Sequence, residues 1–263
     1  MVRKYRTIYY FFILVIPREL IAENCKAIFT PFNKIKITQN EILIVTHASE
    51  IWDTKRSSKK GIDKTIEYAK SNNLEIVYLA SDEHRNGDSY VKDCNPTYWA
   101  KSSGGELHFP INSNHIISVG GKFEFCQGTT IAAIIFDNWG AKNKEDLVIT
   151  QVLDSIYMVG SDIREDAPYY TKYKNAVTEY IPHKSIYKGG DIVENPITLL
   201  QLRDIIKDQT QYISFLKNHL PFYQNISTNY QIIFNYNNLV IEVIRKGIGF
   251  NPPTLTFEFI DSI

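Results

Sequence analysis

The stretch EILIVTHAS, residues 41–49, decides the fold, because its β-branched and aliphatic residues predict a buried strand that ends at polar side chains. After a polar loop, residues 61–73 carry apolar side chains at helical spacing, and LEIVYLASD follows as a second apolar run. Strand, helix and strand at this spacing are typical of a right-handed βαβ unit. We therefore predict parallel strands near 41–47 and 74–80, covered by helices.

Further along the chain the same pattern repeats. HIISVGG predicts a third strand near 115–120, CQGTTIAAIIFDNW predicts the helix after it, and DLVITQVLD predicts a fourth strand near 147–153. Apolar runs that alternate with helices and long crossovers indicate an α/β fold. We expect a mainly parallel sheet with helices on both faces, in a three-layer, Rossmann-like arrangement.

The C-terminal part has a different pattern. Residues 196–220 predict one long helix with Pro196 near its start. Beyond it, two alternating runs flank an Asn-rich turn and TLTFEFID alternates again, so we predict an antiparallel hairpin plus one strand. This divides the chain into an α/β domain over residues 23–195 and a C-terminal extension over residues 196–263.

Residues 1–22 are predicted to be a signal peptide. Three basic residues precede an uncharged apolar run, residues 7–17, which is too short for a membrane span of about 20 residues. Cleavage after about Ala22 would make the protein secreted or periplasmic. The alternative is a buried first strand in a cytoplasmic protein.

The cysteines depend on this choice of compartment. In an oxidising compartment, a Cys25–Cys94 disulfide would leave Cys126 as the thiol, whereas all three cysteines stay reduced in the cytoplasm. The sequence does not choose between these two states.

The charge balance argues against a nucleic-acid partner. Lys and Arg total 29, Asp and Glu also total 29, and no basic face is apparent. No G-x-G-x-x-G follows the first strand, and no second histidine stands at metal-ligand spacing from His84. We therefore expect no cofactor, no metal and no stable membrane span, and a small-molecule substrate.

Polar, titratable and glycine residues follow the predicted strands, at the edge of a parallel sheet where ligands bind. A cysteine at the start of the helix after the third strand has backbone N–H groups and the positive end of the helix dipole beside it. Both lower the thiol pKa, and the same N–H groups can hold an oxyanion. We predict Cys126 as nucleophile, with His47 or His84 as base. The predicted substrate-binding residues are Thr46, Asp82, Gly120, Gly121 and Lys122.

The segment GGKFEFCQGTTIAA resembles, in divergent form, the strand–turn–helix of the isochorismatase-like cysteine hydrolase superfamily, which includes nicotinamidases. Gly120, Cys126 and Thr130 match the family form Gly-x5-Cys-x3-Thr. LEIVYLASDEH, CNPTYWAKSSGGEL and LVITQVLDSIY are similar to further family segments in the same order, so the resemblance spans residues 41–157. It implies an isochorismatase-like fold and hydrolysis of a small amide or ester-like substrate through Cys126.

Two catalytic residues of that family have no match. Thr46 stands where the family has its activating aspartate, and the stretch that should hold a lysine is HFPINSN. Either the activation is rebuilt as a Cys–His pair, with His47 ranked ahead of His84, or the chain is a catalytically inactive binding or effector protein. In that second case the C-terminal extension could offer an edge strand to a second copy or another protein.

Overall fold

The computed structural model describes the following parts of the chain: residues 29–49, 53, 55–80, 96–123, 125–139, 145–158, 186–188, 191–193, 196–218, 229–247 and 252–263. The predicted signal peptide, Cys25, Cys94, Asp82 and His84 lie outside the described residues. Within the described ranges, no helix is long and apolar enough to cross a membrane.

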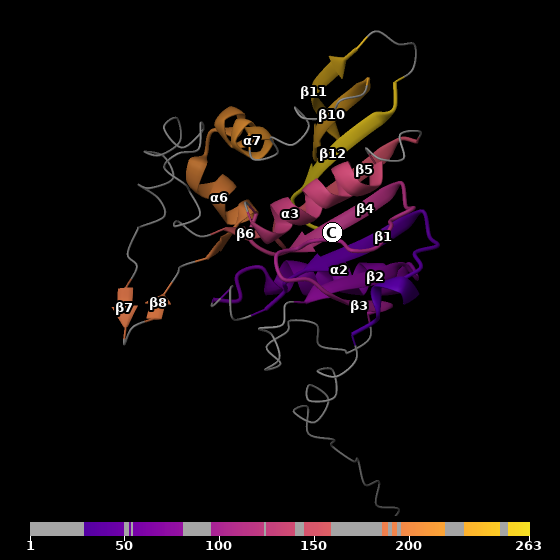
Figure 1. Ribbon diagram of the computed structural model, residues 1–263. Helices are drawn as coiled ribbons and strands as arrows, with labels where there is room; N and C mark the ends of the chain where they lie inside the picture. Colours follow the sequence, from indigo (N-terminus) through magenta and orange to yellow (C-terminus); the bar gives the residue numbers. More distant parts are fainter. Residues whose placement is uncertain are drawn as a thin grey trace, which may run out of the picture.

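One eight-stranded sheet forms the centre of the molecule, in the order β11-β10-β12-β5-β4-β1-β2-β3 (Figure 1). All neighbours in it are parallel except β10 and β11. Ile42 pairs with Glu75 in parallel, which confirms the predicted βαβ unit. The strands are β1 (Glu41–Thr46), β2 (Glu75–Ala80), β3 (Tyr98–Lys101), β4 (His115–Gly120), β5 (Leu147–Val152), β10 (Tyr230–Tyr236), β11 (Leu239–Lys246) and β12 (Thr254–Ile260).

Helices cover both faces of this sheet, as predicted. On one face α2 packs on β1, β2 and β4, and on the other face α3 packs on β1 and β4. The helices and the small strands outside this sheet have the following bounds. The helices are η2 (Phe32–Lys34), α2 (Lys59–Ser71), α3 (Cys126–Ala133), the π-helical η4 (Ile134–Trp139), α6 (Leu199–Ile206) and α7 (Gln209–Asn218), and the small paired strands are β6 (Tyr157–Met158) with β9 (Ile197–Thr198) and β7 (Ile186–Lys188) with β8 (Asp191–Val193).

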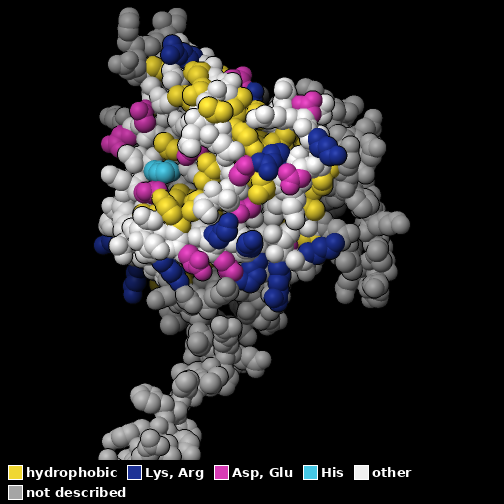
Figure 2. All heavy atoms as spheres, turned by 180° about the vertical axis from the view of Figure 1, so that it is seen from behind, with side chains coloured by type: hydrophobic (Ala, Val, Ile, Leu, Met, Phe, Trp, Pro, Cys, Tyr) yellow, Lys and Arg dark blue, Asp and Glu magenta, His cyan; other side chains and the backbone are white. Residues whose placement is uncertain are grey.

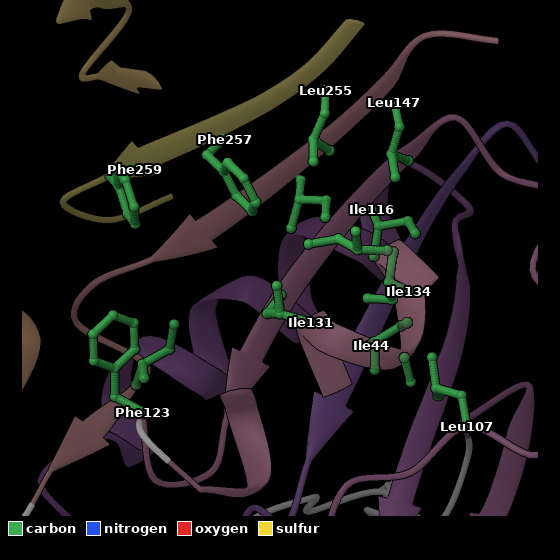
Figure 3. Packing of buried hydrophobic residues seen from close by; sticks show 14 of the residues in the cluster. Ile44, Leu107, Ile116, Phe123, Ile131, Ile134, Leu147, Leu255, Phe257 and Phe259 are labelled. Atoms are coloured by element: carbon green, nitrogen blue, oxygen red, sulfur yellow. The ribbon is translucent and has the colours of Figure 1, made fainter. Parts of the chain in front are cut away.

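The larger core lies between the sheet and α3. Side chains alternate along each strand, so Ile44 faces α3 while Leu43 and Val45 face α2. Figure 3 shows Ile131 of α3 and Ile134 of η4 packed over the strand residues of this cluster. Phe123, just before α3, contacts Phe215 of α7 with ring centroids 6.2 Å apart. These contacts pack α3 against the sheet and place the segment before it against α7.

The predicted single helix over residues 196–220 is wrong, because the structure has two helices there. Lys207 ends α6 in the left-handed conformation, with a φ of 58°, and its N–H donates to the Arg203 carbonyl. The Asp208 carboxylate then accepts a hydrogen bond from the Gln211 N–H at 3.0 Å, which caps α7. A cap inside an apolar periodic segment stops one helix and starts the next.

The predicted hairpin is confirmed. Asn237 and Asn238, with φ of 47° and 66°, form the two-residue turn between β10 and β11. The third strand, β12, lies between β10 and β5 and is parallel to both. Strands on both sides of residue 195 therefore belong to one sheet, while the division into units 23–195 and 196–263 stays a prediction.

Candidate active site

Cys126 is the first residue of α3 and follows directly on the turn after β4. The turn is closed by backbone hydrogen bonds from the N–H groups of Phe125 and Gln127 to the Lys122 carbonyl, at 3.2 and 3.1 Å. The Cys126 side chain is half-buried. A thiol is therefore held at the N-terminus of a helix, at the carboxyl end of a central strand.

Gly121 lies between the carboxyl end of β1 and Cys126. Its φ is 73°, and a β-carbon there would lie 3.3 Å from Thr46 Cγ2 and 3.5 Å from Cys126 Cβ. Gly120, one residue earlier, pairs with Thr46 across β4 and β1. The structure thus brings together four of the predicted site residues, namely Thr46, Gly120, Gly121 and Cys126.

Thr46 has a structural hydrogen bond. Its hydroxyl lies 3.1 Å from the Thr130 hydroxyl. Thr130 directs its single hydroxyl hydrogen at the carbonyls of Gly105 and Cys126, both at 2.9 Å, so it accepts from Thr46. Thr46 therefore ties β1 to α3, and a threonine hydroxyl is not a base that could deprotonate the thiol near neutral pH.

His47 begins the loop after β1. Its φ is 41°, so the strand has ended and the chain turns at this residue. The imidazole is buried, and its Nε2 lies 3.0 Å from the Ser102 carbonyl. A carbonyl only accepts, so Nε2 carries the hydrogen and Nδ1 is the basic nitrogen of the neutral ring. The sequence prediction required this turn at the end of β1.

The loop after β3, residues 102–106, connects the histidine side of the site to the cysteine side. The Ser102 hydroxyl accepts from the Gly105 N–H at 2.9 Å, and the Glu106 carboxylate accepts from the Gly104 N–H at 2.8 Å. Gly105, with a φ of 95°, lies against the Cys126 carbonyl, where a β-carbon would overlap the oxygen. Only glycine fits this contact.

Glu106 braces that loop as an anion. Burial acts to raise the pKa of Glu106, but hydrogen bonds from the Gly104 and Glu106 N–H groups and from the Ser102 hydroxyl lower it overall. Sequence reasoning did not assign Ser102 or Gly105 to the site. The available signal was the GGEL segment of the family resemblance, because adjacent glycines beside an acidic residue mark a close backbone approach.

Lys122 lies beside the turn that precedes the cysteine. Its Nζ is 5.8 Å from the centre of the Phe125 ring, within cation–π range. Lys122 also forms a backbone bridge with Tyr157. The predicted substrate-binding role of Lys122 remains a prediction, as do the catalytic roles of His47 and Cys126. The described residues contain no group of three or more His, Cys, Asp or Glu side chains that could hold a metal ion.

A buried polar cluster lies under the first turn of α3. Gln127 donates to the Ser118 hydroxyl at 2.7 Å, and Ser118 pairs with Gln151 across β4 and β5. Within the described part of the chain, Gln127 Oε1 and both amide atoms of Gln151 have no hydrogen-bond partner. Such atoms reduce stability, and in native structures they often mark functional regions.

Asp154 follows β5 and packs against Gly61 of α2. Burial raises the pKa of Asp154 above its ordinary value of 3.8, although Lys64 and Lys60 oppose this shift. The folded state therefore holds the proton more tightly than the unfolded state. It follows that stability decreases as pH rises from about 3.8 through the raised pKa.

We expect Asp154→Asn to increase the melting temperature at pH 7 and to flatten its dependence on pH. Thermal melts between pH 4 and pH 8 measure this. Asp204→Asn, at a carboxylate whose side chain is 69% exposed, is the control and should change little. A lower melting temperature for Asp154→Asn at pH 7 would show that the carboxylate is stabilising.

No protein-family model matches the sequence, and no curated protein matches it. Among solved structures, the chain is similar to an N-carbamoylsarcosine amidase from Thermoplasma acidophilum, with 15% identity and a TM-score of 0.37 over 52% of this chain and 91% of that chain. It is also similar to a nicotinamidase from Staphylococcus aureus, with 13% identity and a TM-score of 0.34 over 45% and 83%. A cysteine hydrolase from Pseudomonas syringae has 10% identity and a TM-score of 0.32 over 55% and 89%. Because these TM-scores are low, the proposals below depend on the geometry of the site and on the sequence motifs.

Proposed function

We propose that the chain is a cysteine hydrolase of a small amide or ester-like substrate, with Cys126 as nucleophile. One observation carries the proposal: a half-buried cysteine begins α3 at the carboxyl ends of β4 and β1. The N-terminus of a helix stabilises a thiolate and the negative oxygen of a tetrahedral intermediate. The match of Gly120, Cys126 and Thr130 to the family motif supports the same chemistry.

The proposed reaction has two steps. The Cys126 thiolate attacks the substrate carbonyl carbon, a C–S bond forms, and the C–N or C–O bond breaks as the leaving group takes a proton from the protonated base. The base then removes a proton from water, which attacks the thioester and releases the carboxylic acid and the thiolate. We propose His47 as this base, through Nδ1, because its Nε2 hydrogen is held by Ser102.

The test is labelling of the full chain with iodoacetamide at a series of pH values, with Cys126 followed by peptide mass spectrometry. We expect Cys126 to react with an apparent pKa at least about one unit below the 8.5 of an ordinary thiol. His47→Gln should slow its labelling near neutral pH. His115→Asn is the matched control, because His115 is at the opposite end of its strand.

Two outcomes would contradict the proposal. Cys126 could label with an ordinary thiol pKa, or it could stay inert in the folded protein. A panel of small amides and esters then tests turnover, and Cys126→Ser should lower any hydrolysis by at least about a hundredfold.

A binding protein without turnover is the second candidate. The observation that favours it is the Thr46 hydroxyl, which is fully buried and hydrogen-bonded to Thr130 where the resembled family has a catalytic aspartate. An unreactive Cys126, together with saturable binding of a small amide that is never cleaved, would favour this function over the hydrolase.

A further inference from the structure

The strand β11 exposes hydrophobic side chains. The described residues include five exposed large hydrophobic side chains, and three of them are in β11: Leu239, Val240 and Val243, which are 69%, 63% and 46% exposed. In Figure 2 hydrophobic side chains gather on the upper part of the back face, in the region where Figure 1 places the hairpin. Concentrated exposure of this kind marks an interaction surface.

β11 is also an edge of the sheet. It pairs with β10, and no other described strand pairs with it. The opposite edge, β3, has only four residues. The N–H and the carbonyl of its Trp99 are both hydrogen-bonded to Thr30. β11 has eight residues, which is long enough to pair with another strand.

The regular part of β11 is short and carries both signs of charge. Both charged groups also have contacts within the chain: Glu242 forms an ion pair with Lys217 of α7, and Lys246 Nζ lies 5.7 Å from the centre of the Tyr230 ring. A bulge lies opposite Phe234 and Asn235, so uninterrupted pairing with β10 runs from Glu242 to Lys246. The midpoint of that segment is Ile244. Glu242 and Lys246 point to the same face of the sheet, because they are four residues apart on a regular strand.

We propose that β11 pairs antiparallel with β11 of a second copy of this chain, about a two-fold axis at Ile244. This register sets Glu242 opposite Lys246 of the partner subunit, and by symmetry it does so twice. A register centred on Glu242 would instead set Glu242 opposite Glu242 of the partner subunit, so that two negative charges would lie together. The two central sheets then continue as one, and the aliphatic part of Arg245 of the partner subunit covers Val243.

The test is the mass of the full chain in solution, measured by light scattering and analytical ultracentrifugation over a range of micromolar concentrations. We expect a dimer. Val243→Lys should increase the dissociation constant at least about tenfold, since it places a charge on the paired edge. Tyr68→Lys, at a 36% exposed aromatic residue of α2, is the matched control and should leave the dimer intact.

A charge exchange tests the register. Lys246→Glu should weaken the dimer, and so should Glu242→Lys combined with Lys217→Glu, which keeps opposite charges between β11 and α7 within the chain. All three substitutions together should restore the dimer, with thermal melts showing that each variant folds. A monomeric wild-type chain would overturn the proposal, and so would a dimer that Val243→Lys leaves unchanged. A dimer in which the triple variant is weaker than both partial variants would exclude the register centred on Ile244.

Discussion

Replacing Phe257 with alanine should lower the free energy of unfolding of the whole sheet by about 3–5 kcal/mol. Phe257 is 1% exposed and lies in β12, between β10 and β5. Its ring stacks on Phe234 with centroids 5.3 Å apart, and Figure 3 shows it facing the core under α3. The variant loses both the buried apolar area and the ring contact, and it leaves a cavity. Urea denaturation followed by circular dichroism measures the effect.

Phe32→Ala is the matched control, because Phe32 is 37% exposed and should cost less than about 1 kcal/mol. The shape of the transition is as informative as its midpoint. A single transition that shifts as a whole means that the C-terminal strands and the βαβ unit unfold together. A separate early transition in Phe257→Ala would show that residues 196–263 unfold independently.

Gly105→Ala should have the second large effect, on both stability and the reactivity of Cys126. The new β-carbon would overlap the Cys126 carbonyl oxygen and lie 2.9 Å from Thr130 Oγ1. Alanine at a φ of 95° adds backbone strain of about 1–2 kcal/mol before any clash is counted. Because the loop must move away from α3, we expect the labelling rate of Cys126 at pH 7 to change by at least about threefold.

Gly104→Ala is the control beside it. A β-carbon at residue 104 would lie 2.7 Å from Glu106 Oε1 and meets side-chain atoms of Glu106 rather than backbone, so the carboxylate must shift but the loop can stay against α3. This variant should keep the Cys126 labelling rate and most of the stability. If Gly104→Ala and Gly105→Ala behave alike, the contact between the loop and the Cys126 carbonyl has no special role.

The βαβ unit could be predicted from the sequence because burial on both faces leaves a local signature. Every residue from Ile42 to Val45 is apolar, and this pattern does not depend on the rest of the chain. The place of β12 in the sheet has no such signature. Its alternating sequence indicates a strand with one face buried and the other face partly exposed, and its burial pattern agrees. Alternation does not show which strands lie on either side of it.

The candidate site also has some features that local sequence predicts and others that depend on distant segments. The position of Cys126 at a helix start follows from local sequence, since a strand, two glycines and small helical residues adjoin it. The contact of Gly105 with the Cys126 carbonyl depends on how a distant loop returns across the sheet. Two helices in place of one could have been foreseen, because Asp208 is a capping residue inside the apolar pattern.

Because β12 lies between β10 and β5, the central sheet can be completed only after β12 has been synthesised. The Thr254 N–H bonds to Asp146, 108 positions earlier in the chain, and every other strand of the sheet is synthesised before β12. Until β12 arrives, the inner edges of β5 and β10 have no partner, and exposed edges of this kind are where chains aggregate. Contacts between such distant residues also slow folding. A growing chain of this protein therefore stays vulnerable until nearly all of the described sequence has left the ribosome.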